Sequence, residues 1–213
     1  MEHPALPTWL EPQGDHLRAY AELLATVGVE RGLIGPREVP RIWSRHLLNS
    51  AVVAAPEYAL VDHGARVADV GSGAGLPGLV WALARPDLRV TLIEPLLRRA
   101  TFLQETVDSL GVSERVTVVR ARGEEPTMGA REFDVVTARA VAPLAKLLGW
   151  TVPLLRPGGR LLALKGQQAQ EEIEQAASAI RALSLVDLQV LHVGIPWVDP
   201  PTTVVSARTR AAQ

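Results

Sequence analysis

The sequence predicts an α/β protein in which seven strands form one mostly parallel sheet, preceded by a helical cap. Three observations predict this class. From about residue 64 onward, short β-branched or apolar runs alternate with helical stretches, a pattern typical of a parallel sheet covered by helices on both faces. A glycine-rich turn follows the first of these runs. Before residue 64 the apolar side chains keep helical spacing only. We therefore divide the chain into a cap, residues 1–63, and a sheet domain, residues 64–213.

Two helices are expected in the cap. In Asp15–Val29 the apolar side chains recur every three or four residues, and Gly32 ends the pattern. The second segment, Arg41–Ala55, carries its apolar residues on one side and stops before Pro56, because proline cannot continue a helix. The first sixty residues therefore form a small helical unit in front of the sheet.

The sheet domain is expected to alternate strands and helices and to finish with two strands. The expected strands are Arg66–Val70, Arg89–Ile93, Arg115–Val119, Phe133–Thr137, Arg160–Leu164, Ser184–Val193 and Thr203–Ala207. The expected helices are Pro77–Ala84, Leu96–Leu110, Pro143–Leu154 and Ala169–Ala182. The loop Gly194–Pro201 joins the last two strands and favours an antiparallel hairpin at the edge of the sheet.

Composition excludes several classes of protein. The 213 residues contain no cysteine, which excludes disulfides, thiolate zinc sites, iron–sulfur clusters and cysteine nucleophiles. The 22 Lys and Arg against 23 Asp and Glu give a net charge of −1, which argues against a uniformly basic surface but is compatible with one basic face. Residues 1–10 lack the apolar core of a signal peptide. We expect a cytoplasmic protein with no membrane partner and no metal.

A glycine-rich loop and an acid point to a nucleoside-containing ligand. Four glycines lie between residues 71 and 78, directly after the run Val67–Val70, so that a ligand can approach the backbone and meet helix N–H groups. Glu94 ends the next strand, where a carboxylate can bind the hydroxyls of a ribose. A dinucleotide fingerprint needs glycine three residues after Gly73, and Leu76 stands there instead. The loop, with Asp69 before it, resembles motif I of the Rossmann-like class I S-adenosylmethionine-dependent methyltransferases.

The absence of cysteine and the residue that follows the fourth strand together limit the methyl-transfer chemistry that is possible. Without cysteine, the covalent route to carbon 5 of a pyrimidine and radical chemistry on an iron–sulfur cluster are both excluded. What remains is in-line displacement onto an atom that is already nucleophilic, and guanine N7 is such an atom. Arg139 follows this strand, where ligands bind in such sheets. It either anchors an anionic acceptor or pairs structurally with Asp69 or Glu124.

Five stretches together resemble the GidB family, the bacterial ribosomal RNA small subunit methyltransferase G. They are Arg45–Ser50, Asp69–Gly78, Leu92–Glu94 with Arg98-Arg99 and Phe102-Leu103, Ala138–Ala140, and Ala163–Gly166. The resemblance implies S-adenosyl-L-methionine as cofactor and methyl transfer to N7 of a guanine in 16S ribosomal RNA. It places donor contacts at Gly71, Gly73, Leu76, Glu94, Gly123, Glu124 and Arg139. It places RNA contacts at Arg45, His46, Arg98, Arg99, Arg122 and Lys165, and implies catalytic roles for Arg139, His46 and Lys165.

Two other hypotheses stay open beside the RNA methyltransferase. One keeps the same donor but methylates a small anionic metabolite under a lid formed by the N-terminal helices. The other is a nucleotide-sensing module without chemistry. Under the leading hypothesis the partner is 16S ribosomal RNA or the small ribosomal subunit, no obligate protein partner is needed, and the chain is a monomer.

Overall fold

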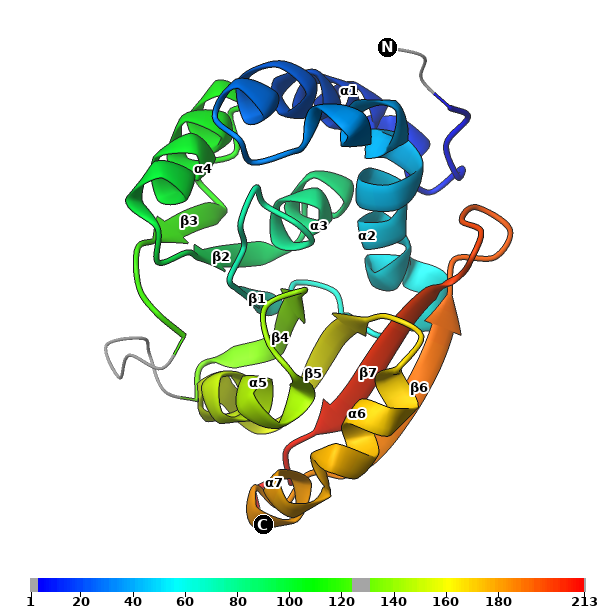
Figure 1. Ribbon diagram of the computed structural model, residues 1–213, viewed down its shortest axis with the longest axis vertical. Helices are drawn as coiled ribbons and strands as arrows, with labels where there is room; N and C mark the ends of the chain where they lie inside the picture. Colours follow the sequence, from blue (N-terminus) through cyan, green and yellow to red (C-terminus); the bar gives the residue numbers. More distant parts are fainter. Residues whose placement is uncertain (1–3, 124–130, 213) are drawn as a thin grey trace.

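The computed structural model describes residues 4–123 and 131–212. Seven strands form one sheet in the order β3-β2-β1-β4-β5-β7-β6 (Figure 1). Their bounds are β1 Arg66–Val70, β2 Arg89–Ile93, β3 Val116–Val119, β4 Phe133–Arg139, β5 Leu155–Lys165, β6 Val186–Val193 and β7 Thr202–Arg208. The first five strands pair in parallel, and β7 runs antiparallel to both of its neighbours. The expected mostly parallel, seven-stranded α/β sheet is confirmed.

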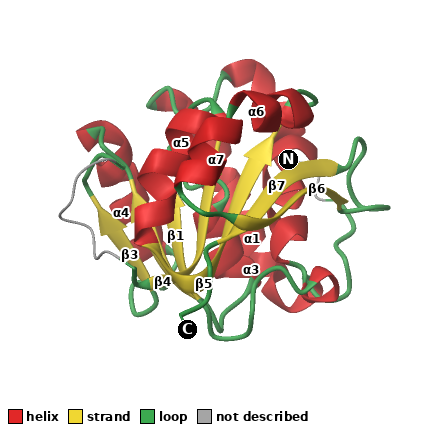
Figure 2. Cartoon of the chain, turned by 90° about the horizontal axis from the view of Figure 1, so that it is seen from below, coloured by secondary structure: helices red, strands yellow, loops and turns green. Residues whose placement is uncertain are grey.

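Helices cover both faces of this sheet (Figures 1 and 2). Those on the face of the cap are α1 Gly14–Leu23, α2 Asn49–Ala51, α3 Gly78–Ala84 and α4 Leu97–Ser109. Those on the opposite face are α5 Leu144–Thr151, α6 Ala169–Gln175 and α7 Ala177–Ala182. Among the described residues, no helix combines the length and the apolar character that a membrane span requires.

The alternation of side chains along each strand divides the core into two apolar clusters. In β1, Val67 belongs to the cluster on the cap side, whereas Ala68 and Val70 belong to the cluster under α5 and α7. Leu17 and Leu47 of the cap share the first cluster with the sheet. Because burial of apolar area is the main stabilising contribution to folding, the cap is held to the sheet by a common core.

Three elements differ from the sequence-based expectation. The second cap helix is π-helical over Ile42–Leu48, and Arg139 donates a hydrogen bond to the Arg45 carbonyl inside it, a type of insertion that distorts helices. Strand β5 begins at Leu155 and runs through a proline and two glycines, beside a register shift in its pairing with β4. The single helix expected over 169–182 is interrupted at Ala176.

The strand order creates the position for a ligand. From β1 the chain winds outward through β2 to β3, and then returns to place β4 on the other side of β1. The loops that follow β1 and β4 therefore leave the sheet in opposite directions. A crevice opens at the carboxyl ends of the strands at such a reversal, and ligands bind there.

Candidate functional site

The glycine loop after β1 is fastened to the end of β2 by Glu94. This carboxylate is 2 % exposed. Its Oε2 accepts a hydrogen bond from the Gly73 N–H at 2.9 Å, and its Oε1 accepts one from the Leu96 N–H at 3.0 Å. A carboxylate offers about four lone-pair sites, so Glu94 keeps acceptor capacity for a ligand while its own position is fixed.

Asp69 lies beneath the same loop and is fully buried. Its Oδ2 accepts a hydrogen bond from the Gly78 N–H at 2.9 Å, whereas its Oδ1 has no partner among the described residues. Burial, which disfavours the charged form, raises the pKa of Asp69 to about 7, against the lowering effect of its hydrogen bonds. The loop therefore has a carboxyl group whose charge changes near neutral pH.

The cap supports the glycine loop from the other side. The buried hydroxyl of Tyr20 in α1 donates a hydrogen bond to the Ala74 carbonyl. A Cβ added at Gly75 would lie 2.8 Å from this hydroxyl, so the close approach requires glycine. Burial raises the pKa of Tyr20 above its ordinary value, and the phenol stays a donor across the physiological range. The cap thus helps to fix the backbone of the loop.

These residues fit the expected nucleoside-containing donor. A Cβ added at Gly73 would meet only the Gly71 carbonyl oxygen, at 3.9 Å, and would otherwise face open space. The open space in front of Gly73 and the fixed Glu94 carboxylate are the two features that such a ligand needs. Leu76 is half-buried against the core on the cap side. Gly123 lies between Val70 and Trp150, and Glu124 falls outside the described residues.

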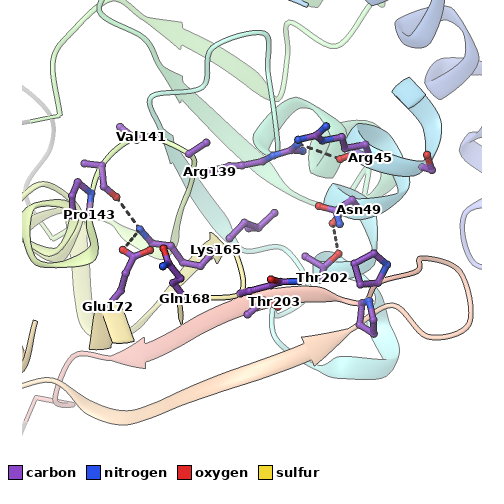
Figure 3. Close-up of a pocket in the computed structure, with 18 of the residues that line it drawn as sticks. Arg45, Asn49, Arg139, Val141, Pro143, Lys165, Gln168, Glu172, Thr202 and Thr203 are labelled. Carbon is purple, nitrogen blue, oxygen red and sulfur yellow. Dashed lines mark hydrogen bonds and ion pairs between the residues drawn. The ribbon is translucent and has the colours of Figure 1, made fainter. Parts of the chain in front are cut away.

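A separate cleft of about 1030 Å³ opens beside the end of β4 (Figure 3). It lies between the cap, the loop after β4, the end of β5 and the start of β7. Its lining includes Arg41, Ser44, Arg45 and Asn49 from the cap, together with residues 139–143, 164–168 and 199–203. Arg41 and Arg45 keep 53 % and 57 % of their side chains exposed. The cleft therefore carries exposed positive charge at its rim, which suits an anionic ligand.

Arg139 lies where the glycine loop and the cleft meet, and its guanidinium is turned toward the cap. Its Nη1 donates to the Ser50 hydroxyl at 3.2 Å, and its Nη2 contacts His46 Nδ1 at 2.9 Å and the Arg45 carbonyl at 3.2 Å. Of the two structural pairings considered for Arg139, the one with Asp69 is not observed, because the guanidinium bonds to groups of the cap, and the one with Glu124 lies outside the described residues. The side chain is held by polar groups of the cap.

The loop after β4 is held by an ion pair that includes Lys165. The Lys165 ammonium donates to Glu172 Oε2 at 2.7 Å (Figure 3) and to the Ala142 carbonyl at 2.8 Å. Glu172 Oε2 also accepts the Leu144 N–H at 2.8 Å. The side chain of Lys165 is only 9 % exposed. These contacts give Lys165 a clear role in fixing the loop, whereas its contact with RNA stays a prediction.

Val141 connects the two parts of the site. It lines the cleft, and one of its methyl groups lies so close to the glycine loop that a Cβ at Gly71 would be 2.7 Å from it. The other three arginines singled out in the sequence, Arg98, Arg99 and Arg122, do not line the cleft. Arg98 and Arg122 are exposed and Arg99 is half-buried. Their contacts with RNA stay predictions.

Sequence reasoning does not single out Glu38, Ser50, Val141 or Glu172. Ser50 lies within the stretch Arg45–Ser50 that carries the family resemblance, so a local signal for it exists. Val141 takes part through its contact with Gly71, far away in the sequence, whereas Glu38 and Glu172 pair with side chains three to eight residues away whose positions the fold determines. No local pattern marks them.

Comparison with known proteins gives consistent results. The family model described as GidB, rRNA small subunit methyltransferase G, matches residues 13–197. A ribosomal RNA small subunit methyltransferase G of Mycolicibacterium smegmatis is 53 % identical and aligns over 100 % of this chain and 92 % of its own length. The protein of the same name from Streptomyces avermitilis is 58 % identical over 87 % of this chain and 76 % of its own.

Solved structures show the same fold at low sequence identity. A putative S-adenosylmethionine-dependent methyltransferase of Methanococcus maripaludis has a TM-score of 0.62 at 11 % identity and covers 100 % of this chain and 99 % of its own. A tRNA (m1A58) methyltransferase of Aquifex aeolicus has a TM-score of 0.60 at 13 % identity, covering 78 % of this chain and 69 % of its own. The fold is thus the Rossmann-like class I methyltransferase fold. From the family match and the curated relatives, the chain belongs to the rRNA small subunit methyltransferase G family.

Proposed function

We propose that this protein transfers a methyl group from S-adenosyl-L-methionine to N7 of a guanine in 16S ribosomal RNA by direct in-line displacement. The chain is a methyltransferase by family, and S-adenosyl-L-methionine is the cofactor of that family and fold. The acceptor, the attacked atom and the in-line geometry are the proposed part. We further propose that it acts in the cytoplasm as a monomer, on the RNA or on the small ribosomal subunit.

The observation that carries the proposal is that the glycine loop with Glu94, which we call the donor cradle, and the cleft with arginines at its rim meet at the loop after β4. Gly71, Gly73 and Glu94 would hold the donor on one side of the loop after β4. The cleft rimmed by Arg41 and Arg45 lies on the other side. An RNA nucleotide is anionic and brings phosphate groups that guanidinium groups bind well. A volume of about 1030 Å³ is ample for one nucleotide.

Methyl transfer to N7 requires that the acceptor be positioned against the methyl group, and it requires no general base. When bound, the cofactor supplies an electrophilic methyl group on a sulfonium. Guanine N7 has a lone pair and no proton, so the bond from N7 to the methyl carbon forms while the sulfur–carbon bond breaks, and the bonding pair leaves with sulfur. No proton is removed, and the positive charge passes from sulfur to the purine. Arg139 orients the acceptor at the junction, and such orientation is worth several orders of magnitude in rate.

The proposal is tested by offering purified small ribosomal subunits and protein-free 16S RNA to the enzyme with isotopically labelled S-adenosyl-L-methionine. Nucleoside mass spectrometry should find label in 7-methylguanosine, and the RNA from cells that lack the protein should have lost one such nucleoside. Arg139→Ala serves as the inactive control. Transfer only to small anionic metabolites, or binding of NAD without binding of the methyl donor, would overturn the proposal.

A further inference from the structure

A chain of polar contacts connects Glu38, on a turn of the cap, to Arg139 at the end of β4. Glu38 Oε2 lies 3.1 Å from His46 Nε2, and His46 Nδ1 lies 2.9 Å from Arg139 Nη2. His46 is only 9 % exposed. Residues 46 and 139 are far apart in sequence and belong to the cap and the sheet respectively, so this contact is made only in the folded protein.

The chemistry of the two end groups fixes the protonation of the imidazole between them. A guanidinium has N–H donors and no acceptor, so His46 Nδ1 must be the acceptor in the contact with Arg139. The single N–H of a neutral imidazole then lies on Nε2 and donates to Glu38. A carboxylate at this position selects that tautomer, as carboxylate partners do for other functional histidines.

The charged groups around His46 favour its neutral form. Burial lowers the pKa of His46 most, and the Arg139 guanidinium facing Nδ1 lowers it further. Glu38 acts in the opposite direction, but its carboxylate is shared with Arg41 at 2.6 Å and with Arg45 at 3.3 Å. Partial burial raises the pKa of Glu38, and its cationic neighbours together lower it below its ordinary value. Glu38 therefore remains an ionised acceptor throughout the working pH range.

The contacts also determine which donors of Arg139 are left for a substrate. A guanidinium has five N–H groups. Both N–H groups of Nη2 are taken by His46 and the Arg45 carbonyl, and one of Nη1 is taken by Ser50. The second N–H of Nη1 and that of Nε have no partner among the described residues. The orientation set by His46 thus determines which two donors the acceptor meets.

We propose that Glu38 is a positioning residue for methyl transfer, which holds His46 as the Nε2–H tautomer so that Nδ1 fixes the guanidinium of Arg139 at the cleft. This rests on the proposed function in that the acceptor is bound beside Arg139. It assigns His46 no contact with the substrate and no proton transfer. Glu38 acts through the hydrogen bond that it accepts from His46 and through the one between His46 and Arg139, and not by its charge alone.

The first experiment compares Glu38→Ala with Glu38→Gln in the full-length protein, with Glu57→Ala as control. Glu57 is exposed on the cap and outside the cleft. The Glu38→Gln variant keeps a side-chain oxygen that accepts the His46 N–H but loses the charge that attracts Arg41 and Arg45. The side-chain ¹⁵N shifts of His46, assigned with the variant His46→Gln, report its tautomer. The rate of methyl transfer to small subunits and the donor dissociation constant are measured on the same samples.

Because Arg139 still faces Nδ1 and favours the same tautomer, we expect Glu38→Ala to keep mainly the Nε2–H form but to lose the hydrogen bond of Nε2 that holds the ring, seen as a changed Nε2 shift. The released ring should lower kcat by about 10- to 100-fold, the loss typical of a misplaced orienting group. Donor affinity should change less than about threefold, because Gly73 and Glu94 are untouched. Glu38→Gln should retain the tautomer and most of the rate, and the control should match the wild type. An Nε2 shift in Glu38→Ala equal to that of the wild type, an unchanged kcat, or equal damage in both variants would overturn the proposal.

A second pair of variants tests the same contacts without altering Glu38. His46→Asn places an amide oxygen near the Nδ1 position and should keep more activity than His46→Gln, whose polar group lies near the Nε2 position. Equal losses of activity in these two variants would overturn the proposal. This test remains available if Glu38→Ala fails to fold. Should the wild type methylate no ribosomal RNA, the proposed function fails, while the ¹⁵N measurements still decide whether Glu38 holds the imidazole through Nε2.

Discussion

Replacing Gly71 by alanine should disturb the junction between the glycine loop and the cleft. Gly71 has φ +72°, in the left-handed region that side chains with a Cβ rarely adopt. The added Cβ would also lie 2.7 Å from Val141 Cγ2 and 3.1 Å from its Cγ1. Two separate costs are therefore expected, one from the backbone and one from the contact with Val141.

The two costs are of similar size. The left-handed conformation costs about 1–2 kcal/mol for a residue with a Cβ. An overlap in a packed core costs about 1–3 kcal/mol, and the overlap with Val141 lies at the lower end of this range because Val141 is 36 % exposed and can shift. Gly73→Ala isolates the first cost, because Gly73 has φ +59° but its Cβ would meet only one atom, at 3.9 Å. We expect Gly71→Ala to lower the free energy of unfolding by about 2–3 kcal/mol and Gly73→Ala by about 1–2 kcal/mol.

The two costs are separated by urea denaturation of the single variants and of Gly71→Ala combined with Val141→Ala. The double variant removes the overlap but keeps the strained backbone, so it should recover most of the difference between Gly71→Ala and Gly73→Ala. Calorimetry with S-adenosyl-L-methionine completes the test. Gly73→Ala should weaken donor binding despite its smaller loss of stability, because its methyl group enters the open space in front of the loop. Equal destabilisation of the two glycine variants, or no recovery in the double variant, would show that the contact with Val141 carries no cost.

Three further predictions concern the charged residues of the site. Arg139→Ala should lower methyl transfer by about 100-fold or more while the melting temperature shows a folded protein; an unchanged rate would remove Arg139 from the mechanism. Glu94→Gln should raise the donor dissociation constant by roughly 10- to 100-fold, because a charged acceptor for the ribose is lost and the amide N–H₂ opposes a backbone N–H; wild-type affinity in calorimetry would contradict the ribose role. Asp69→Asn should change how stability depends on pH. The pKa of Asp69 is raised from 3.8 to about 7, so the folded state holds a proton that the unfolded state releases, and stability falls as pH rises between these values. The asparagine variant should gain up to roughly 4 kcal/mol relative to the wild type from pH 4 to pH 7, measured as the difference between the two unfolding curves, and a constant difference would show that Asp69 does not titrate in this range.

Local sequence patterns are sufficient for most of the fold. They predict the strands Arg66–Val70 and Arg89–Ile93 with their observed bounds, because buried parallel strands are short apolar runs bounded by turn residues. At one place where the cap differs from its expected helix, a tertiary contact intervenes. The π-helical stretch Ile42–Leu48 receives a hydrogen bond from Arg139, which no periodicity in the cap records.

The residues of the site also fall into those that local patterns predict and those that only tertiary contacts reveal. The glycine loop and Glu94 are evident in the sequence because strand, loop and acid are close along the chain and have a fixed geometry in a parallel sheet. The pairing of Lys165 with Glu172 is not evident there, although they are close in sequence, because it depends on how α6 packs over the end of β5. The sequence identifies Lys165, and the fold determines which atoms it binds.

The amino-acid sequence is sufficient for the α/β class, and it also predicts the donor site and, through the absence of cysteine, a direct route for methyl transfer. These predictions depend on composition and on patterns with the periods of helices and strands. The folded structure was needed to learn that β7 lies between β5 and β6, that Val141 packs on Gly71, and that Arg139 is held by the cap. A hydrogen bond or a packing contact depends on distances of a few ångströms between residues that lie far apart along the chain, and local patterns hold no record of those distances.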